Sequence, residues 1–316
     1  MSIAPPPIGQ GHVDDEFHVP ASDDPEWTET CWFTFAVPDR SLSVQFYPYF
    51  RPNLGVAAGA VYIWDGASDD PSTCRYAKNF WHLPMPTTPL TGLSLANGIT
   101  YRCVEALTKY RVGYTDPDGG DLRMTLDVTC LHEPLVLHTH FDQATRATGT
   151  ILIDGETIDV DCVGFRDRSW GVRTQFGSTV MGPARHASYT WAVADDGDGF
   201  FTMCGDFGTG LQNVHGYLRR DGVLSPLVSG TRRVVERSHD RHYPTRVIIE
   251  GTDAEGRSFA AEGRALNGLG WFINPNLYTV NGLFAWDIQA GTAGGAAIGE
   301  DHDNWSAASI RDFHRS

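Results

Sequence analysis

Lysine and net positive charge are the features that this sequence has least of. Only Lys78 and Lys109 are lysines among the 24 basic residues, so Schiff-base chemistry would have to use one of these two. The formal net charge is −15 at pH 7. Because like charges repel, the phosphate backbone of nucleic acids and an anionic membrane surface are poor partners for such a chain. We therefore expect no nucleic acid and no membrane insertion.

Signals for export, for membrane spans and for zinc or disulfide frameworks are also missing. The start, MSIAPPPIGQGHVDDEF, has neither a basic segment nor an apolar segment behind it, and no apolar run approaches the length of a membrane span. The six cysteines form no C-x-x-C pair, which excludes a zinc ribbon and a thioredoxin-like motif. These absences predict a cytoplasmic protein whose cysteines are small buried side chains.

Motifs of cofactor and metal chemistry are few. No G-x-G-x-x-G opens a helix, and neither a Walker loop nor H-E-x-x-H occurs. The segment His138–His140 would place two histidines on one face of a strand, but it brings no third metal ligand. Glu300–Asp303 has the composition of an acidic, solvated loop, with cation binding as the alternative. The sequence therefore predicts no cofactor and no metal.

Turn residues and strand patterns are abundant instead. Glycine (34 residues) and proline (18 residues) recur at short intervals, which leaves little room for helices. Leu122–Cys130 alternates apolar and polar residues, the pattern of a strand with one buried face. Asp154-Gly155 predicts a hairpin, a second hairpin is expected over Arg246–Arg264, and Thr231–Tyr243 fits a short helix or a strand. Many strands at this spacing predict an all-β, antiparallel barrel or sandwich with few short helices.

The strands are expected to form two similar halves. We place an extended N-terminal arm at residues 1–20, an N-terminal β domain at 21–155 and a C-terminal β domain at 156–316. Aromatic residues are numerous, with nine Trp, eleven Tyr and sixteen Phe. They are either ordinary core residues or, in part, the lining of an apolar cavity of the kind that β-barrels enclose.

One motif in the middle of the chain points to a family. Gly164–Arg173 reads GFRDRSWGVR, and its DRSWG resembles the Asp-x-x-Trp-Gly signature of the carotenoid 1,2-hydratase (hydroxyneurosporene synthase) superfamily, which includes lipocalin-like proteins and Diels–Alderase-type fungal cyclases. Gly299–Trp305 resembles the C-terminal motif of a bacterial branch of it. The resemblance implies two lipocalin-like β halves, a hydrophobic cavity, and cofactor-independent hydration, isomerisation or cyclisation of terpenoid or polyketide substrates. It maps an acid onto Asp167, although Arg168 stands where the hydratases usually carry His or Asn.

The residues around Asp167 allow two interpretations. Protonation of an alkene requires a neutral carboxylic acid, and an apolar pocket raises the pKa of a carboxyl group. Arg166 and Arg168 would oppose this, but in an extended strand both point to the face opposite Asp167. In the structural alternative Asp167 pairs with Arg173 and pins the turn, while Trp170 covers the core.

The predicted function is a cofactor-independent lyase or isomerase of the hydratase–dehydratase type, which acts on a hydrophobic, terpenoid-like alkene or alcohol by acid/base proton transfer. The predicted catalytic residues are Asp167, as the acid, and His186 and Tyr189. The predicted substrate-binding residues are Trp170, Trp191, Trp271, His138 and His215. The alternatives are a non-catalytic, lipocalin-like carrier of a lipophilic ligand and a cyclase on the same fold. The expected partner is a hydrophobic small molecule, and the sequence leaves a homodimer open.

Overall fold

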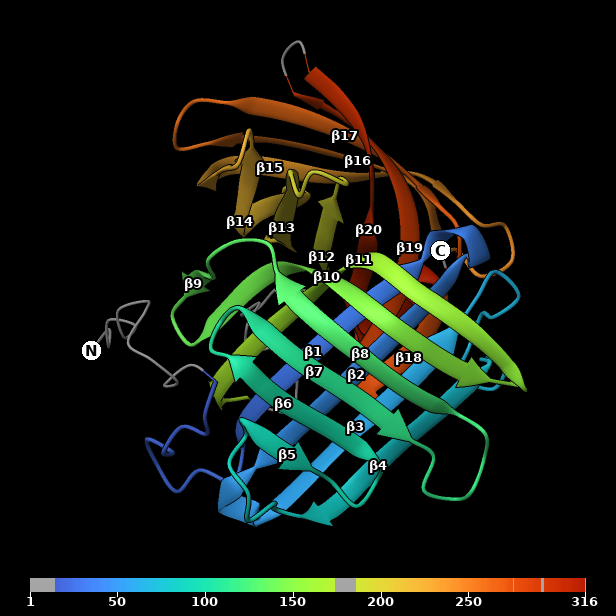
Figure 1. The fold of residues 1–316 in the computed structure, drawn as a ribbon. Helices are drawn as coiled ribbons and strands as arrows, with labels where there is room; N and C mark the ends of the chain where they lie inside the picture. Colours follow the sequence, from blue (N-terminus) through green and yellow to red (C-terminus); the bar gives the residue numbers. More distant parts are fainter. Residues whose placement is uncertain (1–14, 174–185, 275, 291–292, 316) are drawn as a thin grey trace. The chain divides into compact units, whose positions relative to one another are not determined.

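The computed structural model describes residues 15–173, 186–274, 276–290 and 293–315, so residues 1–14 of the predicted arm lie outside the described residues. The chain divides into two compact units that consist almost wholly of strands (Figure 1). Unit 1 holds Met1–Val37, Val44–Ile63 and Arg75–Val172, and unit 2 holds Pro38–Ser43, Trp64–Cys74 and Arg173–Ser316. Residue 155, at the predicted domain boundary, lies in a turn inside unit 1.

Unit 1 is built on one antiparallel sheet with the strand order β4-β3-β2-β1-β11-β10-β8-β7-β6-β5, in which β9 also pairs with β10. Its strands are β1 (Trp27–Val37), β2 (Leu42–Arg51), β3 (Val56–Trp64), β4 (Tyr76–Pro84), β5 (Gly92–Ser94), β6 (Ile99–Glu105), β7 (Lys109–Thr115), β8 (Arg123–Cys130), β9 (Leu135–Leu137), β10 (His140–Ile153) and β11 (Glu156–Val172). The first residues of β2 and the last of β3 belong to unit 2. The long strand β11 lies between β10, its neighbour in sequence, and β1, from the start of the chain.

Two sequence patterns of unit 1 are confirmed. Burial alternates along β8 from Arg123 to Thr129, as predicted from the alternation of apolar and polar residues. The turn Asp154-Gly155 has φ values of 54° and 73° and joins β10 to β11 as the predicted hairpin. Asp and Gly are suited to this turn because they tolerate the left-handed backbone region.

Unit 2 is a closed barrel with the strand order β17-β16-β15-β14-β13-β12-β20-β19-β18, closed by an additional pairing of β17 with β19. Its strands are β12 (His186–Val193), β13 (Gly199–Asp206), β14 (Leu211–Arg220), β15 (Val223–Arg237), β16 (Pro244–Asp253), β17 (Ser258–Ala265), β18 (Leu269–Asn274), β19 (Leu277–Ala290) and β20 (Ala293–Ser306). The second predicted hairpin is β16–β17. Of the undecided segment Thr231–Tyr243, the part up to Arg237 is the end of β15, and residues 238–243 connect β15 to β16.

Helices are short and few in the described ranges. Two 3-10 turns, Pro38–Arg40 and Pro52–Leu54, follow β1 and β2. The helix α1 (Ala307–Phe313) is capped by Ser306, whose side chain accepts a hydrogen bond from the Ser309 amide. The predicted all-β architecture of two antiparallel parts is therefore confirmed. No helix within the described ranges is both long and apolar enough to cross a bilayer.

The barrel of unit 2 contains an apolar core and a buried ionic cluster on the same strand faces. The core includes Phe200, Phe259 and Trp286. Arg232 donates to both carboxylate oxygens of Asp301, at 2.8 and 2.6 Å, and to Asp303 at 2.9 Å. All three side chains are fully buried. The solvated acidic loop expected at Glu300–Asp303 is therefore wrong, because the segment is a buried part of β20. Burial of Asp301 and Asp303 is possible because Arg232 pairs with both carboxylates.

This cluster predicts acid-sensitive folding. Burial by itself would raise the pKa of Asp303, but Arg232, His186 and Arg237 hold that pKa well below 3.8. A carboxylate with a lowered pKa stabilises the fold above its unfolded pKa, near 3.9, and this contribution is lost as the pH falls toward the folded value. Asp303→Asn should lower the free energy of unfolding at pH 7 by about 1–3 kcal/mol, because charge-assisted contacts to Arg232, Arg237 and His186 are lost while Arg232 keeps Asp301.

Urea unfolding at pH 7 and at pH 3 measures this effect, with exposed Asp287→Asn in β19 as the control. The loss caused by Asp303→Asn should shrink at pH 3, because Asp303 of the wild type is protonated in the unfolded state there and part of its contribution to stability is already lost. An equal loss at both pH values, or a similar loss in the control, would contradict the assignment.

Close contact between β12 and β20 gives a second prediction. A Cβ at Gly299 would lie 1.8 Å from the carbonyl oxygen of Trp191. Because the obstacle is backbone, Gly299→Ala should lower the free energy of unfolding by about 1–3 kcal/mol. Gly92→Ala in β5 is the control, since a Cβ there meets nothing within 4 Å. Chemical denaturation of both variants tests the prediction, which fails if the two behave alike.

Candidate functional site

The pairing of β10 with β11 in unit 1 brings polar residues together in the middle of the sheet. Asp142 lies opposite Asp167, and His140 lies opposite Ser169. Residues directly opposite in an antiparallel pair, and residues two apart on a strand, project to the same face. The four side chains therefore share one face of the sheet.

The two arginines beside Asp167 project to the other face. Arg166 donates to Asp15 at 2.9 Å, and Arg168 donates to Glu29 at 3.1 Å. Both arginine side chains are completely buried. The extended geometry expected for residues 165–169 is therefore confirmed, and both arginines have carboxylate partners on the face opposite Asp167.

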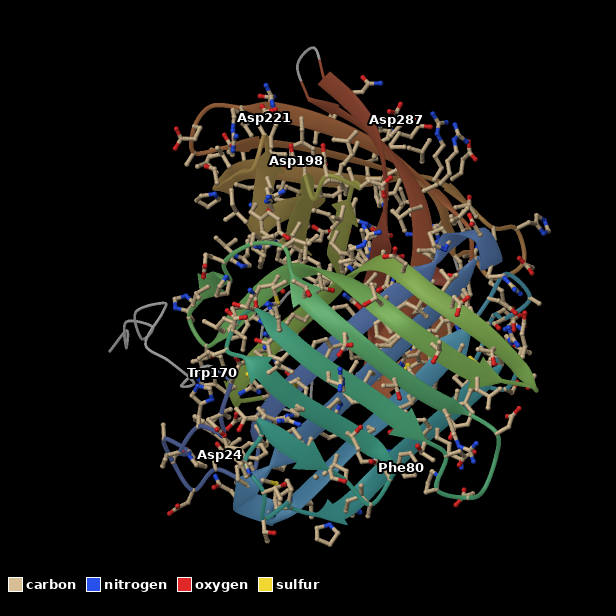
Figure 2. The ribbon with its side chains drawn as sticks, viewed as in Figure 1. Asp24, Phe80, Trp170, Asp198, Asp221 and Asp287 are labelled. Carbon is tan, nitrogen blue, oxygen red and sulfur yellow. The ribbon has the colours of Figure 1, made fainter. Side chains whose placement is uncertain are left out.

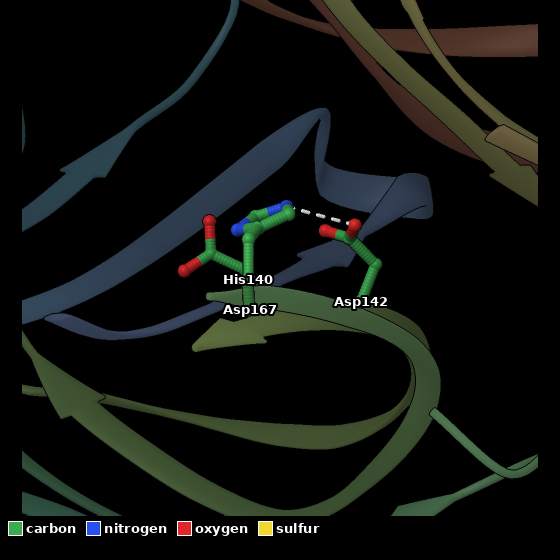
Figure 3. A group of neighbouring side chains, drawn as sticks. All are labelled: His140, Asp142 and Asp167. Carbon is green, nitrogen blue, oxygen red and sulfur yellow. Dashed lines mark ion pairs between the residues drawn. The ribbon is translucent and has the colours of Figure 1, made fainter. Parts of the chain in front are cut away.

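Both ring nitrogens of His140 have a close polar neighbour. Its Nε2 lies 2.8 Å from Oδ2 of Asp142, and its Nδ1 lies 2.9 Å from Oγ of Ser169. His140, Asp142 and Ser169 are all buried, whereas Asp167 is partly buried. Figure 3 shows His140 and Asp142 on the same strand, with the carboxylate of Asp167 beside the imidazole. An imidazole fixed in this way can exchange a proton with a neighbouring carboxyl group.

The same group offers ligands of the kind that divalent cations use. One ligand atom from each of His140, Asp142 and Asp167 lies within 4.8 Å of the other two. One imidazole and two carboxylates are donors that zinc or manganese accept. The expected histidine pair at His138–His140 is wrong, because His138 lies in the exposed turn between β9 and β10 with φ of 55°. Leu137 pairs with His140, so the two residues between them form the hairpin turn.

Trp170 lies on the arginine face of β11. Its ring packs with Trp27 and Phe141 in a buried cluster, and His18 stacks on it with ring centroids 4.0 Å apart. Figure 2 shows Trp170 beside the first described residues of the chain. Trp170 therefore covers part of the core of unit 1, as the structural interpretation expected, and it projects away from the face that carries Asp167.

The two other predicted catalytic residues lie in unit 2, on β12. His186 Nε2 is 2.6 Å from Oδ1 of Asp303, and the His186 ring stacks on Trp305 at 3.6 Å. The ring of Tyr189 lies 4.7 Å from that of Phe201. His186 is thus bound into the ionic cluster of the barrel.

The remaining predicted ligand-binding residues are also in unit 2. Trp191 is fully buried in β12, and His215 in β14 contacts the ring of Phe201 at 5.7 Å. Trp271 in β18 contacts the ring of Trp64 edge-on at 6.0 Å.

Two imidazole–carboxylate contacts were not predicted from the sequence. Asp142 follows His140 by two residues in β10, and Glu300 precedes His302 by two residues in β20, where Glu300 Oε2 and His302 Nε2 are 2.8 Å apart. The signal in both places is a histidine and an acid two residues apart on a strand, a spacing that puts them on one face. Each unit therefore carries a buried imidazole–carboxylate pair.

Solved structures of the same fold are similar along nearly the whole chain. A protein described as AttH from Nitrosomonas europaea is 15% identical, with 95% of this chain and 99% of that one covered and a TM-score of 0.61. Kievitone hydratase from Nectria haematococca is 11% identical, with 95% and 93% covered and a TM-score of 0.59. CghA is 14% identical, with 94% and 96% covered and a TM-score of 0.57. Identities this low establish a shared fold, not a shared reaction.

These structures confirm the fold that the resemblance implied. No curated protein matches the chain by sequence. The family described as "Domain of unknown function (DUF7064)" matches residues 11–295, which is most of the chain. The protein belongs to this family.

Proposed function

We propose that the protein is a lyase or isomerase of the hydratase–dehydratase type, which moves a proton to or from a hydrophobic, terpenoid-like alkene or alcohol without a cofactor. The observation that supports this most is the cluster of His140, Asp142 and Asp167 on one sheet face, with ligand-capable atoms within 4.8 Å of one another. Titratable groups gathered on one face in this way are the usual machinery of acid/base catalysis.

Asp167 is the proposed acid. It is the least buried member of the cluster, so it is the one best placed to meet a substrate. Arg166 and Arg168 are bound to other carboxylates, so they stabilise the ionised form of Asp167 less than the sequence alone suggests. The shared face with Asp142 favours the acid form, since two close carboxyl groups resist being ionised together.

His140 is the proposed base. Ser169 and Asp142 fix the orientation of its ring, as second groups commonly do for a catalytic imidazole. In the hydration direction, the Asp167 carboxyl O–H transfers its proton to an alkene carbon. Water then forms the new C–O bond to the adjacent cationic carbon, and His140 accepts the proton that the water loses. Dehydration reverses each transfer.

His186 was the partner predicted from sequence, and we now assign it a different role. Its contact with Asp303 ties it to a carboxylate that Arg232 and Arg237 also bind. We therefore propose that His186 supports the barrel of unit 2. Tyr189, also predicted as catalytic, receives no step in the proposed reaction, and the substrate contacts expected at Trp191, Trp271 and His215 remain predictions.

The fold comparison gives the proposal its reaction class. One protein of this fold is named a hydratase, and another, CghA, was crystallised with Sch210972. A lipophilic carrier needs no convergent titratable groups, so the buried His140–Asp142 pair argues against that alternative. The expected homodimer and cytoplasmic location remain predictions.

Turnover in D₂O tests the proposal. The protein is incubated with a panel of terpenoid alkenes and allylic alcohols, and deuterium incorporation is followed by mass spectrometry. Asp167→Asn and His140→Gln should each lower kcat/KM by about 10²–10⁴-fold, because each removes a proton-transfer group. Asp159→Asn, an exposed substitution on the same strand, should leave turnover unchanged. Full turnover in a folded Asp167→Asn variant would refute the assignment.

A further inference from the structure

The side chain of Arg166 lies in an aromatic cage inside unit 1. Its guanidinium carbon is 4.1 Å from the ring centroid of Tyr110, 5.1 Å from that of Phe141 and 5.6 Å from that of Phe33. Aromatic faces attract a cation but do not neutralise it. Because Arg166 is 0% exposed, the fold needs an anion beside it.

Asp15 supplies this anion and is itself completely buried. Its carboxylate accepts hydrogen bonds from Arg166 Nη2 at 2.9 Å, from the Tyr110 hydroxyl at 2.9 Å and from the Leu107 amide at 2.7 Å. Burial would raise the pKa of Asp15, but the charge of Arg166 and the hydrogen bonds from Leu107 and Tyr110 lower it below 3.8. The group is therefore an ionised carboxylate held by a cation, a hydroxyl and an amide.

The donors and the anion come from different kinds of structure. Arg166 is in β11 and Tyr110 in β7, and Leu107 is in the turn that joins β6 to β7, so strand pairing positions all three donors. Asp15 precedes the first strand and reaches across 151 residues of sequence to Arg166. The three donors thus lie in the sheet and in its β6–β7 turn, whereas Asp15 lies in the segment that precedes β1.

That segment has attachments of its own besides Asp15. Glu16 accepts a hydrogen bond from the Thr91 hydroxyl at 2.7 Å, and Phe17 packs edge-on against Phe50 at 4.9 Å. These contacts do not use Arg166 or Tyr110. Loss of the Asp15 carboxylate should therefore empty the donor set without removing the donors.

We propose that Arg166, Tyr110 and the Leu107 amide form a carboxylate-binding site, with Asp15 as its intramolecular occupant, and that a free small monocarboxylate binds there once Asp15 is removed. A carboxylate has two oxygens in one plane and can accept from several donors at once. The Asp15 side chain beyond Cα is chemically an acetate group, so acetate is the matching ligand. The site lies on the face of β11 opposite Asp167 and does not depend on the proposed reaction.

Thermal unfolding of Asp15→Gly in sodium acetate and in sodium chloride of equal ionic strength tests the site. Acetate at ten times its Kd should raise the Tm of this variant by about 3 °C relative to chloride. Wild type should not respond, because Asp15 fills the site. Asp15→Asn should not respond to acetate either, because its side chain still fills the site. The double variant Asp15→Gly with Arg166→Met should not respond, because it lacks the cation that would bind acetate.

Equal effects of acetate and chloride on Asp15→Gly, or an equal acetate effect in the double variant, would overturn the proposal. If Asp15→Gly does not fold in chloride, refolding from urea replaces the melting experiment, with recovery of circular dichroism as the readout. Recovery in acetate alone supports the site. Recovery in neither salt, or in both equally, contradicts it.

Discussion

The buried pairing of the β11 arginines with carboxylates determines what the opposite face of unit 1 can do. Arg166 binds Asp15 and Arg168 binds Glu29, and all four groups are almost completely buried. Breaking such a pair by removing one partner typically costs about 3–5 kcal/mol, because a buried charge is left uncompensated. These pairs hold both arginines on one side of the strand. Asp167 therefore shares its own side with His140 and Asp142, and its environment is set by them.

The fold contains imidazole–carboxylate contacts in two different surroundings. His140 contacts a single carboxylate of Asp142 and a serine hydroxyl, an arrangement that lets a proton move. Asp303, the partner of His186, also accepts from two guanidinium groups and from the Trp305 indole. Many donors on one carboxylate favour its ionised form and fix its position. The same pair of residue types therefore lies in two different surroundings, and we propose the first for proton transfer and the second for structural support.

Local sequence patterns predicted several strands and turns of the fold correctly. The two-residue period of a strand predicted the alternation in β8 and the placement of Arg166 and Arg168 on the face opposite Asp167. The Asp154-Gly155 turn was predicted from residues that tolerate the left-handed backbone region. His138 could not be placed, because the hairpin turn there uses a left-handed non-glycine residue that carries no turn signature.

What the sequence could not supply is the partner of each buried charge. Arg232 and Asp301 are 69 residues apart, and Asp15 and Arg166 are 151 apart, so their contacts depend on which strands become neighbours. The acidic run at Glu300–Asp303 was interpreted as solvated for the same reason, since nothing near it in sequence neutralises it. Asp142 was missed because its meeting with Asp167 depends on the register between β10 and β11. The sequence shows that a charged residue is present, but only the tertiary structure shows which residue of opposite charge pairs with it.

The proposed reaction requires that the cluster of Asp167, Asp142 and His140 keeps a carboxyl group protonated at neutral pH. Infrared difference spectroscopy of protein labelled with ¹³C at aspartate carboxyl carbons, wild type minus Asp167→Asn, tests it most directly. We expect the C=O band of a protonated carboxylic acid in the wild type at pH 7 and its loss in the variant. A difference spectrum that contains only carboxylate bands would contradict it.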